Sequence, residues 1–177
     1  MSTPFLFMKL TVGGKQIDGE SSERNFERQI VLDSLEWDTA VSHEPVLDKK
    51  DTKKVKTTPK PKRLTITKAF DRSSTNLCTF VAEHTPFSDA VITMVKSASW
   101  DKDGAIPRRM IVMTLTNGLV ESVSMTASES GLAVGVREIA TLSFKTIRIV
   151  YYPGAAEGAR GEMPPTTFDL LMPSVND

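Results

Sequence analysis

The sequence contains little cysteine and histidine, and it lacks a long hydrophobic run. Cys78 is the only cysteine among the 177 residues, which excludes an intramolecular disulfide. His43 and His84 are the only histidines, which disfavours a histidine-based metal site. The apolar segment 5–12 contains Lys9 and is much shorter than the roughly 20 residues of a membrane-spanning helix. We therefore expect no metal, no other cofactor and no membrane insertion.

The chain also lacks an excess of charge of either sign. It has 22 basic and 22 acidic residues, which gives a formal net charge of zero. This balance disfavours a strongly basic nucleic-acid binder or an acidic disordered tail as a description of the whole chain. Residues 1–8 have no basic region and no clear cleavage site, so we expect no signal peptide and synthesis in a cytoplasm. The length suits one domain over residues 1–177.

Short apolar or alternating segments, separated by turn residues, indicate a mainly β protein. Strands are expected over 5–12, 30–37, 63–70, 90–97, 110–115, 120–127, 138–152 and 167–172. The apolar parity of 30–37 changes across Asp33-Ser34, which indicates a bulge or bend. Asn117-Gly118 is typical of a two-residue hairpin turn. This pattern favours a β-barrel of about seven or eight antiparallel strands, with a C-terminal segment over 153–177.

One helix is expected between the third and fourth strands, packed on the outside of the barrel. Asp71, Ser73 or Ser74 can begin it, and Pro86 ends it. Four residues recur at the spacing of one helical face: Leu77, Phe80, Val81 and His84. Cys78 lies among these residues, so we expect a buried and unreactive thiol.

The connection over residues 43–63 is long, basic and punctuated by proline. Its basic residues are Lys49, Lys50, Lys53, Lys54, Lys56, Lys60, Lys62 and Arg63. A loop of about 20 residues without secondary structure is normally functional or disordered. Three interpretations stay open: a contact with a polyanion, a solvated loop, or a contact with an acidic patch on another copy. No aromatic residue within 49–62 can stack on a base, which counts against nucleic acid.

No arrangement of residues points to catalysis. The sequence lacks the glycine-rich loops of nucleotide-binding proteins and the nucleophile elbow of hydrolases. Asp101, Asp103 and Gly104 resemble part of a calcium loop, but the later ligands are missing. We therefore expect a protein that is not an enzyme. Apolar residues on both faces of 5–12 and 110–115 indicate instead that a helix or a second subunit covers the outside of the sheet.

Residues 64–74 read Leu-Thr-Ile-Thr-Lys-Ala-Phe-Asp-Arg-Ser-Ser, and the expected strands over 30–37 and 138–151 lie on either side of them in the chain. Taken in order, these segments resemble the haemolysin co-regulated protein family, the inner-tube proteins of type VI secretion, and the related phage tail-tube proteins. Residues 64–74 are similar to a family pattern of an aromatic residue, Thr-Lys, Asp, a basic residue and a Ser that opens a helix, and the other two segments are similar to family strands. Ile66 and Thr75 depart from the family pattern, as does the basic character of 43–63.

The resemblance implies a structural subunit of a contractile injection machine. In this family six copies form a ring around a channel, strands of neighbouring copies join into one barrel, and rings stack into a tube. The implied partners are other copies, a sheath protein, a baseplate or spike hub and a tube terminator, with DNA or effectors passing through the channel. The destination is a phage tail assembled in the host cytoplasm or, alternatively, a bacterial cytoplasm followed by type VI secretion.

The family's long loop after the second strand reaches neighbouring subunits, and residues 43–63 match it. We expect its basic residues to contact acidic residues of the next ring. The candidate acids are Glu20, Glu23, Glu27, Asp101 and Asp103. The alternative function is a monomeric nucleic-acid-binding β-barrel that uses the same basic loop. A small-ligand barrel or an enzyme is the weakest alternative, because no convergent polar groups can be placed.

Overall fold

The chain folds into eleven strands and one helix in the part that the structure describes. The computed structural model describes residues 5–38, 41–47, 53–59, 63–95, 109–130, 133–153 and 166–171. The strands are β1 (Leu6–Val12), β2 (Lys15–Ile17), β3 (Ile30–Val31), β4 (Ser34–Trp37), β5 (Val41–Leu47), β6 (Lys53–Pro59), β7 (Arg63–Ala69), β8 (Pro86–Val95), β9 (Arg109–Ser130), β10 (Ala133–Tyr151) and β11 (Thr166–Leu171), and the helix is α1 (Ser74–Glu83). The mainly β prediction is confirmed, although strands are more numerous than the expected seven or eight.

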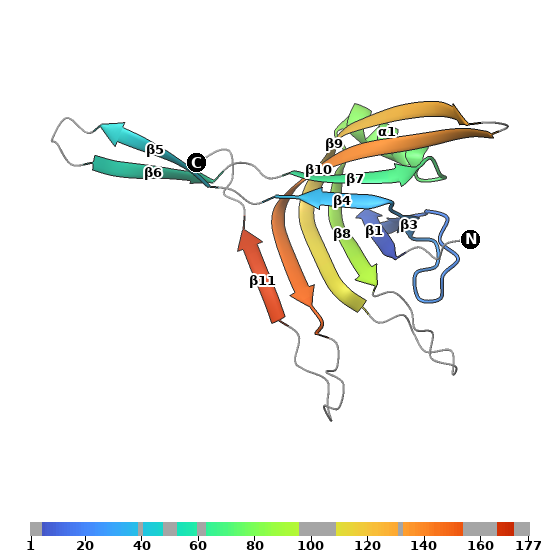
Figure 1. The fold of residues 1–177 in the computed structure, drawn as a ribbon, viewed down its shortest axis with the longest axis horizontal. Coiled ribbons are helices and arrows are strands. Elements are labelled where there is room, and N and C mark those ends of the chain that lie inside the picture. The colour runs from blue at the N-terminus through green and yellow to red at the C-terminus, as the bar shows by residue number, and fades with distance from the viewer. Residues whose placement is uncertain are drawn as a thin grey trace, which may run out of the picture.

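Nine strands form a strongly curved antiparallel sheet (Figure 1). Neighbours follow the order β2–β1–β8–β9–β10–β7–β4, while β3 pairs with β1 and β11 pairs with β10. This ladder does not close into the predicted barrel. Residues 30–37 instead cross between its ends, where the Leu32 N–H donates to the Leu6 carbonyl (2.9 Å) and the Asp33 N–H to the Thr67 carbonyl (2.7 Å). The bend predicted after Asp33 is confirmed, and it lets consecutive strands pair with β1 and β7.

β9 is one continuous strand, so the hairpin turn predicted at Asn117-Gly118 is wrong. The strand pairs with β10 over residues 111–130. Asn117 takes a left-handed φ of 52°, which bends the strand. A Cβ at Gly118 would lie 2.1 Å from the Ser143 carbonyl oxygen and 2.2 Å from the Phe87 ring. The dipeptide therefore bends a long strand and lets the aromatic ring lie against its backbone, and it does not reverse the chain.

Part of the predicted loop over 43–63 is a two-stranded antiparallel sheet. β5 and β6 pair with Glu44 opposite Lys56 and Val46 opposite Lys54. Figure 1 shows this β5–β6 hairpin extending away from the main sheet. β-Branched residues are frequent in both strands, and such residues favour extended structure. The predicted extended connection is therefore present, but with its own secondary structure.

Helix α1 closes one end of the core beside β9 (Figure 1). Leu77 is fully buried, and Phe80 and Val81 pack against the core. The helix ends at His84, whose left-handed backbone (φ 52°) directs its N–H to the last carbonyls. Cys78 is exposed, which corrects the prediction of a buried thiol, because one residue turns the side chain about 100° away from the buried Leu77.

Candidate assembly site

The apolar core opens to the surface at one end of the sheet. Three rows of residues that face each other across neighbouring strands show this on the core-facing side. From the inside outward, the rows are Leu10–Ala90–Leu115–Ile147, Met8–Ile92–Met113–Ile149–Phe168 and Leu6–Met94–Ile111–Tyr151. The first row is fully buried. In the outer rows Phe168 is 48% exposed and Tyr151 is 46% exposed. Burial therefore decreases step by step toward the ends of β8, β9 and β10.

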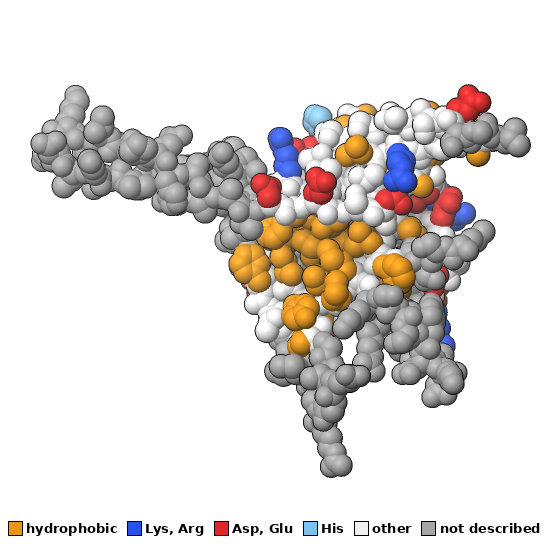
Figure 2. All heavy atoms as spheres, in the orientation of Figure 1, with side chains coloured by type: hydrophobic (Ala, Val, Ile, Leu, Met, Phe, Trp, Pro, Cys, Tyr) orange, Lys and Arg blue, Asp and Glu red, His pale blue; other side chains and the backbone are white. Residues whose placement is uncertain are grey.

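We call this surface the open-end patch. It consists of Leu6, Met94, Ile111, Ile149, Tyr151 and Phe168. Figure 2 shows a continuous apolar area on this face, below a band of charged side chains. Isolated apolar residues are normal on a protein surface, but a contiguous patch marks a place of interaction. The open-end patch is thus the candidate assembly surface.

The strand β11 forms one side of the open-end patch, and among the other described strands it pairs with β10 alone. Arg148 donates to both carboxylate oxygens of Asp169, at 2.6 and 3.2 Å. These hydrogen bonds lower the pKa of Asp169 and raise the pKa of Arg148. The outer edges of β11 and β4 have no strand partner in the described residues, and such edges can pair with another chain.

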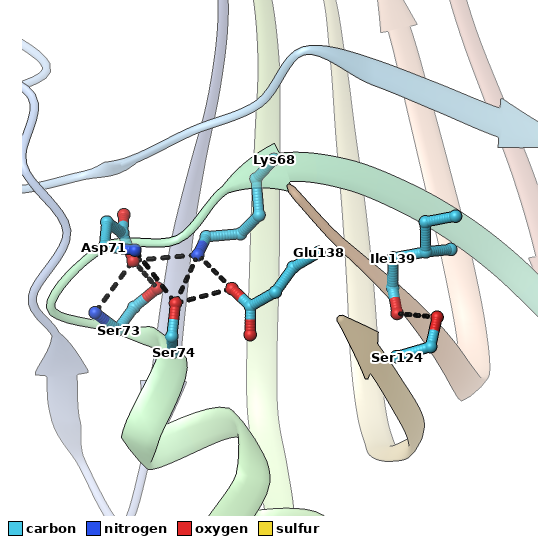
Figure 3. Close-up of polar contacts among 7 residues, drawn as sticks. All are labelled: Lys68, Asp71, Ser73, Ser74, Ser124, Glu138 and Ile139. Carbon is cyan, nitrogen blue, oxygen red and sulfur yellow. Dashed lines mark hydrogen bonds and ion pairs between the residues drawn. The ribbon is translucent and has the colours of Figure 1, made fainter. Parts of the chain in front are cut away.

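A buried cluster of charged and hydroxyl side chains lies where β7, β10 and α1 meet (Figure 3). Lys68 and Glu138 are both 0% exposed. The Lys68 ammonium donates to Glu138 Oε2 (2.7 Å) and Ser74 Oγ (2.9 Å), and it forms an ion pair with Asp71 Oδ1 (2.8 Å). Ser74 donates to the same Glu138 oxygen (2.5 Å). Asp71 also accepts a hydrogen bond from the Ser73 N–H (2.8 Å).

The start of α1 is fixed by this cluster and not by an ordinary cap. Ser73 occupies the N-cap position but makes no capping hydrogen bond with its side chain. Ser74, the first helical residue, accepts from the Asp71 N–H (2.9 Å) and bonds Glu138. A carboxylate beside a helix N-terminus is electrostatically favourable. The Glu138 carboxylate thus ties the first turn of the helix to β10.

No role was predicted for Lys68 or Glu138, although the residue pattern of their strands contains a signal. In 63–70 the inward positions alternate as Leu64, Ile66 and Lys68, so the lysine stands at a core-facing position. Glu138 likewise precedes Ala140 in the alternation of β10. Charged residues at inward positions are almost never fully buried unless they are paired. Two such residues of opposite charge could therefore have been matched.

The predicted contact residues are only partly placed. Glu20 and Glu27 are exposed and Glu23 is half-buried, all in the segment between β2 and β3. Arg63 forms an ion pair with Glu121 (2.5 Å), which is not among the predicted acidic partners. Lys53, Lys54 and Lys56 lie on β6. The remaining candidates are outside the described residues: Lys49, Lys50, Lys60, Lys62, Asp101 and Asp103.

The described residues contain no cluster of three or more His, Cys, Asp or Glu side chains that could hold a metal ion. In the same part of the chain, no helix has the length and hydropathy required to cross a membrane.

Solved structures with the same fold include one described as a type six secretion system protein, with 18% identity and a TM-score of 0.67, covering 95% of this chain and 96% of that one. Hcp1 of Salmonella typhimurium has 24% sequence identity and a TM-score of 0.61, covering 93% of this chain and 94% of that one. Hcp1 of E. coli EAEC 042 has 18% identity and a TM-score of 0.65, covering 84% and 92%. The secreted protein Hcp3 of Pseudomonas aeruginosa has 13% identity and a TM-score of 0.60, covering 97% and 100%. The chain therefore has the Hcp fold.

A family comparison identifies the chain more narrowly. Residues 7–151 match the model of the family described as "Type VI secretion system effector, Hcp". No curated protein matches the chain significantly. Because the family model spans most of the sequence, the chain belongs to the Hcp family, the haemolysin co-regulated proteins, and the expected resemblance is confirmed. It is a structural subunit of a type VI secretion inner tube, in a family that assembles into rings and tubes.

Proposed function

We propose that the open-end patch is the surface through which copies of this chain join into a hexameric ring. The observation that supports this is the exposure of a continuous part of the core at one end of the sheet. Covering Tyr151 and Phe168 with a neighbouring copy would complete the burial that the inner rows already have. A ring needs a heterologous contact, in which this patch meets a different surface of the next copy.

We propose further that the β5–β6 hairpin joins one ring to the next. Its strand β6 carries Lys53, Lys54 and Lys56, and the hairpin extends away from the main sheet (Figure 1). The expected acceptors are the exposed Glu20 and Glu27 and the other acids named above. Exchanging the three lysines for glutamate should leave rings intact and prevent tubes. Tubes of normal length from this variant would contradict the proposal.

Membership of the Hcp family favours a role in type VI secretion over a role in a phage tail or in nucleic-acid binding. We propose that the chain acts in a bacterial cytoplasm and is secreted by the type VI system, with effectors in the channel. A sheath protein, a spike hub and a terminator are the partners proposed for the tube. A phage tail and a monomeric nucleic-acid-binding barrel gain no support from the family match. One domain over residues 1–177 remains a prediction.

The ring proposal is tested by negative-stain electron microscopy of the purified chain, together with its mass in solution. Wild-type protein should form rings with a central channel. Tyr151→Lys should yield monomers, because a charge would have to be buried at the contact. Tyr152→Lys is the matched control. Tyr152 directly follows the last residue of β10 and its N–H still donates to the Met110 carbonyl (2.9 Å), and adjacent residues of an extended chain point to opposite faces. Rings of normal stability from Tyr151→Lys, or equal losses in both variants, would contradict the proposal.

A further inference from the structure

The outer part of the β9–β10 pair is a two-stranded arm. β7 accompanies β10 only as far as Ala69 opposite Arg137, followed by one hydrogen bond from the Phe70 N–H to the Val136 carbonyl (3.0 Å). Beyond this point, in the described residues, β9 and β10 pair only with each other, over 127–130 and 133–136. Figure 1 shows this arm projecting from the body. A two-stranded ribbon alone is only marginally stable, so its direction has to be set at its root.

The buried cluster lies at the root of the arm. Glu138 stands opposite Lys68 of β7 and opposite Met125 of β9. Its carboxylate bonds both Lys68 and Ser74 (Figure 3), so one side chain of β10 is held by β7 and by the first turn of α1. The Lys68 ammonium uses its donors on Glu138, Ser74 and Asp71. These contacts are directional, and they fix an angle as well as a distance.

The cluster is not built for maximum stability. Both charges are removed from water, and in the described residues Glu138 Oε1 has no hydrogen-bond partner. A buried ion pair commonly contributes no more to folding than apolar residues of similar volume, whereas removing one partner alone is costly. An unpaired buried oxygen adds a further cost. A geometric role explains the pair better than a stabilising role does.

We propose that the Lys68–Glu138 pair is a lock that holds the β9–β10 arm in one direction relative to α1, and that assembly requires this direction. This inference rests on the proposed ring assembly. The arm and its root carry apolar side chains that this direction presents to a second copy. Their exposed fractions are 44% for Phe70, 53% for Met125 and 69% for Val134.

The test replaces the lock by apolar side chains in the full-length chain. Lys68→Met with Glu138→Leu keeps the volume and removes both buried charges together. Asp71 and the Ser74 hydroxyl each lose one partner, but no buried ammonium is left without its carboxylate, so the melting temperature should fall much less than in Glu138→Leu alone. Amide hydrogen exchange over 127–136 should become about tenfold faster relative to β8, because the root no longer fixes the arm. The yield of rings should fall by about tenfold at the same protein concentration. Glu138→Gln keeps an oxygen acceptor for Lys68 and Ser74 and should retain most assembly.

An exposed ion pair on the same sheet is the matched control. Arg63→Met with Glu121→Leu removes the pair between β7 and β9 and should leave arm exchange unchanged. Unchanged arm exchange in the lock variant overturns the proposal, and so does normal ring formation. A lock variant that fails to fold also overturns it, because the pair would then supply stability. If wild-type protein forms no rings, the proposed ring function fails, while arm exchange in the monomer still decides on the lock.

Discussion

The two ends of the long β9–β10 pair differ in the kind of interaction found there. At one end the apolar rows continue outward until Tyr151 and Phe168 are half exposed. At the other end the core stops at two fully buried charges, Lys68 and Glu138. Apolar contact is non-directional and tolerates many partners, whereas a charged hydrogen-bond cluster specifies one geometry. The open end is suited to being covered by a copy, and the arm end is suited to fixing a direction.

The largest effect on stability is expected when one of the two buried charges at the arm end is removed. Glu138→Leu leaves the Lys68 ammonium buried without its carboxylate, which should lower the free energy of unfolding by about 3–5 kcal/mol. Urea denaturation followed by tryptophan fluorescence measures this change. Glu138→Gln is the control and should cost less, because its amide oxygen can still accept from Lys68 and Ser74. Equal costs for the two variants would contradict the view that the lysine needs a hydrogen-bond acceptor.

The second prediction sharpens the contrast within the open end. Leu115→Ala removes a fully buried side chain from the inner row and should cost about 2–5 kcal/mol of unfolding free energy. Tyr151→Ala, at the outer row, should cost about 1 kcal/mol or less in the monomer, since that side chain is 46% exposed. Denaturation at a protein concentration below that of ring formation separates the two values. Equal values would show that the outer row is already covered within one chain.

The third prediction concerns the bend of β9 at Asn117-Gly118, which lies between the open end and the arm end. Gly118→Ala places a methyl group against the Ser143 carbonyl and the Phe87 ring, and the backbone oxygen cannot move aside cheaply. We expect a loss of about 1–3 kcal/mol from overpacking. Gly135→Ala in the same hairpin is the control, because nothing lies within 4 Å of the added Cβ. Its unfolding free energy should stay within about 0.5 kcal/mol of wild type. A harmless Gly118→Ala would mean that β10 or Phe87 shifts freely.

The sequence predicted the parts of the molecule that depend on local pattern. The apolar alternation of 63–70 and the bend after Asp33 were recognised because parity is visible in the residues themselves. Asn117-Gly118 was misread because its role is set by the distant Phe87 ring, which the local sequence does not reveal. The open-end patch was anticipated only as apolar residues on both faces of strands. Its location depends on the register of separate strands, which pattern alone does not give.

The smallest expected effect concerns the attachment of β11 at the open end. The hydrogen bonds from Arg148 hold the pKa of Asp169 below its usual value. The stabilisation is therefore complete above the ordinary aspartate pKa of 3.8 and is lost as pH falls through the lowered folded value. Both groups are exposed, so salt should weaken the effect. Between pH 6 and pH 3, amide exchange of 166–171 should accelerate more than that of β9, after correction for intrinsic rates. Asp169→Asn should exchange faster at pH 6 and lose this extra acceleration. If wild type and Asp169→Asn show the same pH profile, the pair does not hold β11, and the β10 ladder alone keeps that strand at the edge of the open-end patch.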